Sequence, residues 1–234
     1  MRRAVREATN PGLQSRAPPT DTIAEGRGDF ATMDWEPAFF QTEAARNGGV
    51  VQPFQQGLWL QLNNIAYVGG GCVPLSIQWI ICQQLDFNLI ANQLDPQIVG
   101  NVRRMCVEYT FNPASRAFDS NYPDAQLAPY GIQLECVISL QNSLTFITEL
   151  VQNIRGMPGG YFFIGFQGYF RSQAFSGHAI AVDSHRCAFF DPNLGQATFT
   201  GNLNGMCATL RAVLETCYRV DSPTLIIRRY RRPT

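Results

Sequence analysis

The middle of the chain carries apolar residues at helical spacing, and its C-terminal half carries dense apolar runs typical of buried strands. In segment 143–154, the side chains of Leu144, Ile147, Leu150 and Ile154 recur three or four positions apart, which predicts a helix. Helices are predicted over residues 73–85, 95–109, 143–154 and 203–218. Strands are predicted over residues 161–170, 178–182, 186–190 and 224–230. Helices that precede an antiparallel sheet indicate an α+β domain.

The N-terminal region differs from the rest in composition. It is rich in Arg, Ala, Pro, Thr, Gly and Asp and contains hardly any large apolar side chains, so burial cannot offset the entropy of ordering it. We therefore expect a flexible leader over residues 1–33 and one folded domain over residues 34–234. The leader lacks the apolar stretch of a secretory signal peptide, and no stretch of the chain is apolar for long enough to span a bilayer. No integral membrane segment is predicted.

Charge and cysteine usage exclude several classes of function. The 18 basic residues balance 18 acidic ones, and this net charge of zero gives no electrostatic reason to expect a nucleic-acid partner. The seven cysteines are odd in number and widely spread, and only two histidines are present. The paired ligand spacing of a structural zinc site is therefore missing. We expect reduced cysteines, no metal and no cofactor.

Cys72 stands out because three glycines precede it and a predicted helix follows it. Its sulfur would lie close to unpaired backbone N–H groups and to the positive end of the helix dipole, which favours a thiolate. The glycines would let a substrate approach the backbone, and the Cys72 N–H is a natural donor to an oxyanion. We interpret Cys72 as a nucleophile and the other six cysteines as buried side chains.

The possible bases are His178 and His185, the two histidines of the chain. Segment 177–195 is typical of two strands joined by a tight turn, which would leave His185 exposed. If the turn is centred between residues 184 and 185, His178 faces Asp191 directly, with Cβ atoms about 5 Å apart on one sheet face. A hydrogen bond between them would orient the imidazole. The alternative is a core histidine at 178 and an Asp-Pro-Asn turn that begins at Asp191.

Three motifs support the first interpretation. They are Cys72 at a helix start with Trp79 seven residues on, Gly177-His178-Ala179-Ile180-Ala181, and Phe189-Phe190-Asp191-Pro192-Asn193-Leu194-Gly195. Together they closely resemble the YopT/AvrPphB family of papain-like cysteine proteases, effectors that bacterial pathogens and symbionts inject into host cells. The resemblance covers roughly residues 55–230 in element order. It implies a papain-like fold, in which a central helix with the nucleophile at its N-terminus packs on an antiparallel sheet that carries His and Asp.

The resemblance also implies roles for individual residues. Cys72 would be the nucleophile, His178 the general base and then acid, and Asp191 the carboxylate that orients the imidazole. Family members add a second oxyanion donor, a side-chain amide a few residues before the nucleophile. The near-upstream residues here carry no amide, so the candidates for this donor are the closest amides, Asn63 and Asn64, with Tyr67 as an alternative donor.

By this resemblance the chain is expected to be a cysteine endopeptidase, secreted from a bacterium into the host-cell cytoplasm. It would act as a monomer on a host signalling protein such as a small GTPase or a kinase. A deamidase or acyltransferase toxin with the same Cys-His-Asp residues is an alternative, because all of these reactions proceed through an acyl-enzyme. A catalytically inactive module that binds a host protein is another, and Cys72→Ala would leave its binding unchanged.

Overall fold

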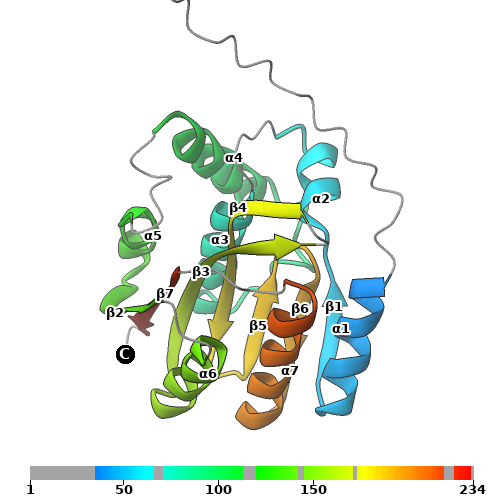
Figure 1. Ribbon diagram of the computed structural model, residues 1–234. Helices are drawn as coiled ribbons and strands as arrows, with labels where there is room; N and C mark the ends of the chain where they lie inside the picture. Colours follow the sequence, from blue (N-terminus) through cyan, green and yellow to red (C-terminus); the bar gives the residue numbers. More distant parts are fainter. Residues whose placement is uncertain are drawn as a thin grey trace, which may run out of the picture. The chain divides into compact units, whose positions relative to one another are not determined.

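The computed structural model describes residues 35–65, 71–112, 120–141, 145–170, 173–218 and 224–232 (Figure 1). The leader predicted at 1–33 lies outside these residues, as do Ala66, Tyr67 and two of the three glycines before Cys72. The first described element begins at Trp35.

The described part of the chain forms one seven-stranded sheet in which every neighbouring pair of strands is antiparallel. Along the sheet the strands follow the order β1-β6-β5-β4-β3-β7-β2. Their bounds are β1 Val50–Pro53, β2 Gln133–Gln141, β3 Gly160–Phe170, β4 Gln173–Asp183, β5 Ala188–Asp191, β6 Gly195–Thr198 and β7 Thr224–Arg231.

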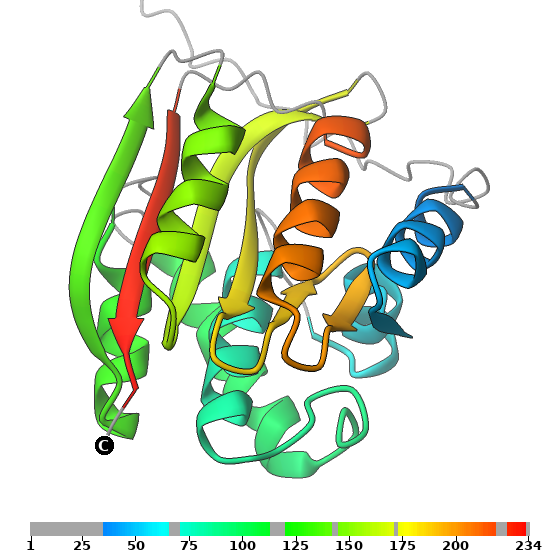
Figure 2. The same cartoon turned by 90° about the horizontal axis from the view of Figure 1, so that it is seen from below.

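Helices cover both faces of the sheet. Their bounds are α1 Trp35–Arg46, α2 Gln56–Leu62, α3 Cys72–Gln84, α4 Pro96–Phe111, α5 Tyr122–Leu127, α6 Phe146–Gly156 and α7 Leu203–Thr216, with a short 3-10 helix at Ala128–Tyr130. Helices α1, α6 and α7 lie on one face, and α3 with α4 lies on the other (Figures 1 and 2). Within the described ranges, no helix combines the length and apolar character that crossing a bilayer requires.

Strand β3 shows how the two layers of core are specified. Successive side chains of a strand point to opposite faces. Phe162 and Ile164 accordingly belong to the apolar cluster under α6 and α7, whereas Tyr161 and Phe163 belong to the cluster under α3. Because both faces are covered, the strand reads as an unbroken apolar run in the sequence.

Helix α3 is almost entirely buried, and Trp79 anchors it to the sheet. The indole ring stacks on Phe190 of β5, with ring centroids 6.0 Å apart, and its Nε1–H donates to Gln196 Oε1 of β6 at 2.8 Å. Burial of the large apolar ring and satisfaction of its single polar group both favour this position. Trp79, seven residues after Cys72, thus holds α3 against the strands that lead to Asp191.

The predicted helices and strands are all present, with ends displaced by a few residues. The helix predicted at 95–109 begins at Pro96, because Asp95 is its N-cap and accepts hydrogen bonds from the N–H groups of Gln97 and Ile98. The helix predicted at 143–154 begins at Phe146. Residues 143 and 144 lie outside the described ranges.

The predicted order of helices before sheet is incomplete, because the two edge strands come from upstream. Strand β1 precedes α3 and pairs with β6, whereas β2 precedes α6 and pairs with β7. β1 and β6 each contain four residues, and β2 is largely exposed, so none of the three carries the dense apolar run that marks the central strands. Helices α1, α2 and α5 were not predicted either, and α2 and α5 are only two turns or less.

Candidate active site

Cys72 is the first residue of α3, and the residue before it explains how closely α3 approaches α2. Gly71 is the N-cap of α3, and a Cβ atom there would lie 2.5 Å from Leu60 Cδ1. A side chain at this position would therefore force the buried Leu60 side chain to shift. The first N–H groups of a helix have no acceptor within it and form the positive end of its dipole. The structure places the Cys72 side chain, which is buried, at this end of α3.

One turn further along, Ser76 ties α3 to the strand that carries His178. The Ser76 hydroxyl donates to the carbonyl oxygen of Ala179 at 3.1 Å. Both residues are buried, so this bond satisfies a polar pair within the core. Because Ala179 follows His178 directly, the contact fixes the Cys72 end of α3 relative to the imidazole.

His178 and Asp191 are hydrogen-bonded, with His178 Nε2 3.1 Å from Asp191 Oδ1, and both side chains are buried. Their predicted direct opposition is wrong, however. That register would pair Ala181 with Ala188, whereas the structure pairs Ala181 with Phe190. The shift is of two residues, so it preserves the sheet face on which each side chain lies. His178 and Asp191 therefore meet diagonally across the hairpin.

The turn between β4 and β5 explains the shifted register. Asp183 Oδ1 accepts hydrogen bonds from the backbone N–H groups of His185 and Arg186, and Cys187 has a positive φ of 51°. An aspartate that bonds the backbone two residues on, followed by a left-handed residue, makes a longer turn than the tight one expected. His185 is exposed within this turn, as predicted.

Asp191 both begins a turn and contacts the imidazole of His178. Its Oδ1 accepts from the Asn193 N–H at 2.8 Å, and its carbonyl oxygen accepts from the Leu194 N–H at 3.1 Å, so it does begin a turn. The same Oδ1 atom receives His178 Nε2. Asp191 Oδ2 is buried and has no hydrogen-bond partner among the described residues. The turn thus holds the carboxylate in place for the imidazole.

The surroundings of His178 keep its ring charged. Burial disfavours the protonated ring, but the Asp191 carboxylate and a hydrogen bond with Cys72 outweigh burial and raise the pKa of His178 to about 10. Because Nε2 contacts Asp191, the nitrogen left for Cys72 is Nδ1. An imidazolium beside a cysteine sulfur is the partner that a thiolate nucleophile requires.

Tyr218 is a member of this site that the sequence did not indicate. It follows α7, and its hydroxyl donates to Asp191 Oδ1 at 2.9 Å and lies 3.1 Å from His178 Nε2. Its ring stacks on the imidazole, with ring centroids 4.8 Å apart and planes inclined by 22°. Phe166, the cross-strand partner of His178, packs edge-on against both rings. An aromatic residue at the end of a predicted helix carries no signal for such a contact.

The candidate oxyanion donors lie at the C-terminal end of α2. Asn63 Nδ2 donates to the carbonyl oxygen of Trp59 at 2.9 Å, within its own helix end, and Asn64 is exposed with a positive φ of 51°. In the described part of the chain, no hydrogen bond joins either amide to Cys72. The alternative donor, Tyr67, lies outside the described residues.

The remaining cysteines differ from Cys72 in their surroundings. All seven are free thiols, and burial raises the pKa values of Cys82, Cys187 and Cys207, and that of Cys106 to about 12. Cys136 departs from the prediction of buried side chains, because it is only half-buried on the edge strand β2. The described residues contain no group of three side chains that could hold a metal ion.

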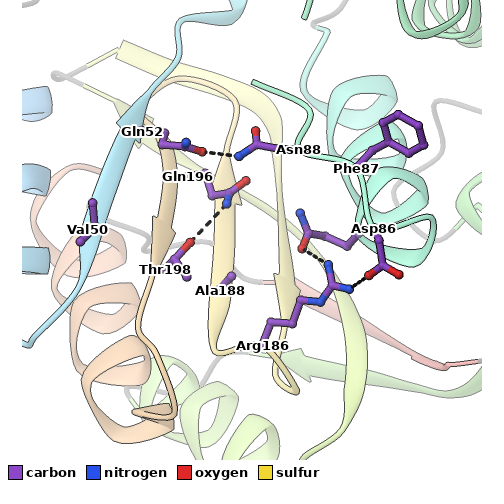
Figure 3. A pocket seen from close by; sticks show the side chains of 10 residues that line it. Val50, Gln52, Asp86, Phe87, Asn88, Arg186, Ala188, Gln196 and Thr198 are labelled. Atoms are coloured by element: carbon purple, nitrogen blue, oxygen red, sulfur yellow. Dashed lines mark hydrogen bonds and ion pairs between the residues drawn. The ribbon is translucent and has the colours of Figure 1, made fainter. Parts of the chain in front are cut away.

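A pocket of about 410 Å³ lies at the other end of α3, away from Cys72 (Figure 3). Its polar side chains bond one another: Arg186 pairs with Asp86, Asn88 Nδ2 donates to Gln52, and Gln196 Nε2 donates to Thr198. None of Cys72, His178 and Asp191 lines it. This pocket is therefore separate from those three side chains.

No protein-family model matches the chain, and a comparison with curated proteins finds no match. Among solved structures, the crystal structure of the Pseudomonas avirulence protein AvrPphB matches it with a TM-score of 0.51 and 18% sequence identity. The match covers 72% of this chain and 98% of that chain. The chain shares the fold of AvrPphB. Helix α3 packed on an antiparallel sheet, together with this likeness to AvrPphB, agrees with the mixed helix and sheet architecture expected from the sequence.

Proposed function

We propose that the chain is a cysteine endopeptidase in which Cys72 is the nucleophile, His178 the general base and acid, and Asp191 the orienting carboxylate. The observation that carries this proposal is a continuous set of contacts from the N-terminus of α3 through the imidazole to a buried carboxylate. A nucleophile, a base in contact with it and a group that orients the base are the parts that acyl transfer needs.

In the proposed reaction, the Cys72 thiolate attacks a substrate carbonyl carbon and forms a tetrahedral adduct. The imidazolium of His178 gives its Nδ1 proton to the leaving amine, so the peptide bond breaks and a thioester remains. The neutral imidazole then takes a proton from water as the water oxygen attacks the thioester. Release of the carboxylic acid restores the thiolate and the imidazolium. Asp191 stabilises the imidazolium at both ends of this cycle.

The oxyanion of the adduct would lie at the N-terminus of α3, where the Cys72 N–H is available as a donor. Asn63 and Asn64 remain the proposed sources of a second donor. For Asn63 this requires its amide to leave the Trp59 carbonyl when substrate binds. Loss of one such donor typically costs about 10²-fold to 10³-fold in kcat. Asn63→Ala and Asn64→Ala, measured separately, would identify the one that contributes.

The biological setting that we propose rests on the likeness to AvrPphB and on the three sequence motifs. The chain would be a bacterial effector that reaches the host-cell cytoplasm and cleaves a host protein, such as a small GTPase or a kinase. In this proposal, Cys72 of α3 and His178 of β4 would carry the steps given above, which involve no cofactor.

Mass spectrometry of host lysate tests this function without a known substrate. Lysate is incubated with the wild-type protein, with Cys72→Ala, or with His185→Ala as the matched control, because His185 is the exposed turn histidine. New chain ends that form with the wild type and the control variant but not with Cys72→Ala would support the endopeptidase. A mass increase of about one dalton at glutamine, without cleavage, would indicate a deamidase that uses the same residues. Identical lysates in all samples would contradict the proposal.

A further inference from the structure

Tyr218 contacts both His178, which would pair with the Cys72 sulfur, and Asp191, which would orient His178. It does so from a fully buried position. Its side chain is 1% exposed. The ring covers one face of the imidazole, and the hydroxyl meets Asp191 Oδ1 and His178 Nε2 at the edge of that ring. Phe166 packs edge-on against both rings. The imidazole is therefore held by packing as well as by hydrogen bonds.

The direction of the Tyr218 O–H bond is set by residues behind it. Asn193 Nδ2 donates to the hydroxyl oxygen at 3.2 Å, and Gln56 Nε2 donates to Asn193 Oδ1 at 2.6 Å. The Gln56 N–H also donates to the carbonyl oxygen of Pro192 at 2.8 Å. With a donor on one side of the oxygen, the hydroxyl hydrogen points to Asp191 Oδ1. A series of hydrogen bonds thus runs from the start of α2 to the carboxylate.

This arrangement distinguishes the two neutral forms of His178. Nε2 faces Asp191 Oδ1 and the Tyr218 oxygen, and each of these oxygens can accept a hydrogen bond from an Nε2–H group. A lone pair on Nε2 would face these two oxygens without a hydrogen between them. The proton of the neutral ring is therefore favoured on Nε2, and the lone pair on Nδ1, the nitrogen left for Cys72. Burial and the nearby Asp191 carboxylate raise the pKa of Tyr218 well above its usual value, so the hydroxyl keeps its proton throughout.

We propose that Tyr218 is a positioning residue, which holds His178 in the tautomer and orientation that serve Cys72, with Asn193 and Gln56 fixing the hydroxyl from behind. This inference rests on the function proposed above. In the proposed reaction, Tyr218 acts through its contacts with His178 and Asp191. Its effect passes through the imidazole, and its loss lowers the reactivity of Cys72 while the fold remains.

The test compares Tyr218→Phe with Tyr230→Phe. Both substitutions keep a buried ring and remove one hydroxyl that donates to a carboxylate, to Asp191 in the first case and to Asp124 at 2.7 Å in the second. Tyr230 belongs to the cluster under α3 and has no contact with His178 in the described interactions. The rate of Cys72 alkylation by limiting iodoacetamide is measured by peptide mass spectrometry from pH 5 to pH 9, with circular dichroism as the check of the fold.

In Tyr218→Phe, we expect Cys72 to be alkylated about tenfold more slowly than in the wild type near pH 6, which corresponds to an activation free energy higher by about 1.4 kcal/mol. The pH profile of this rate should be displaced to higher pH. A displaced imidazolium stabilises the thiolate less, so on acidification the thiolate is protonated at a higher pH than in the wild type. Tyr230→Phe should stay within about twofold of the wild type, because its hydroxyl donates to Asp124 rather than to Asp191. Coincident profiles for Tyr218→Phe, Tyr230→Phe and the wild type would overturn the inference.

A second variant covers a failure of Tyr218→Phe to fold. Asn193→Ala removes the donor to the Tyr218 oxygen and leaves both rings in place, and it should slow alkylation in the same direction. An unchanged rate in a folded Asn193→Ala variant would then overturn the inference. The wild type separates this result from a failure of the proposed function. If Cys72 of the wild type reacts no faster than Cys82 or Cys187 near pH 6, the nucleophile assignment itself fails.

Discussion

His178 and Asp191 are joined by a 3.1 Å hydrogen bond although they are not opposed residues of the hairpin that carries them. The bond is retained despite a register displaced by two positions, because an even shift keeps both side chains on one face, where they meet diagonally. Asp191 is also fixed by its own turn, through the N–H of Asn193. The contact between His178 and Asp191 is therefore compatible with a longer β4–β5 turn than the one that direct pairing requires.

The two histidines provide an internal comparison for the proposed mechanism. Cys72→Ala and His178→Ala should each abolish turnover, because the first removes the nucleophile and the second removes the proton carrier in contact with it. His185→Ala should retain activity within about twofold, since an exposed turn residue lies outside the network. Rates of appearance of new chain ends in host lysate provide the measurement. Activity in His178→Ala equal to that in His185→Ala would refute the role of His178.

Asp191→Asn should preserve the turn but lower kcat by on the order of 10³-fold or more, as loss of the orienting carboxylate does in serine triads. The amide carries no negative charge to stabilise the imidazolium, although its Oδ1 can still accept hydrogen bonds from the Asn193 N–H and from His178 Nε2. Since ground-state binding of the substrate does not involve Asp191, KM should change little. Steady-state kinetics on an identified substrate would measure both. A variant with wild-type kcat would exclude Asp191 from the mechanism.

The raised pKa of His178 links the stability of the fold to pH. The pKa of His178 is about 10 in the folded state, against 6.5 for histidine in an unfolded chain. The charged ring therefore stabilises the fold fully below about pH 6.5. This contribution is lost as the pH rises from 6.5 through 10. The free energy of unfolding, measured in urea across this window, should fall more steeply for the wild type than for His178→Gln. Parallel pH dependences for the two proteins would contradict the assignment.

Gly71→Ala should displace the N-terminus of α3, because the new Cβ would lie 2.5 Å from Leu60 Cδ1 in a fully buried contact. We expect a loss of about 1–3 kcal/mol in stability, which is typical of overpacked cores, together with slower alkylation of Cys72. Gly100→Ala in α4 is the matched control, because its Cβ would meet nothing within 4 Å. That variant should be neutral or more stable by about 0.5–1 kcal/mol. Urea unfolding compares the two, and equal stabilities would show that the close packing of Gly71 on Leu60 is not required.

Much of this architecture follows from the sequence alone, because burial imposes a period on each element. The buried helix α3 and the central strands were predicted because their apolar side chains form long runs. Cys72, His178 and Asp191 could be selected as candidates because histidine is scarce and a cysteine follows three glycines at a helix start. These are local features of the chain, which the sequence displays directly.

Other features depend on how distant segments pack, and the sequence does not display them. The register of β4 with β5 depends on a hydrogen-bonded turn at Asp183 and on the left-handed backbone conformation of Cys187. A cysteine in the sequence gives no sign of this conformation, which glycine and asparagine adopt more readily. Strand β2 is an exposed edge, and only its pairing with β7 makes it a strand. Tyr218 reaches His178 because the residues that follow α7 pack against β4, although the two positions are 40 residues apart in the chain. Periodic burial sets which residues face a core, but the packing of the whole sheet decides which of them meet.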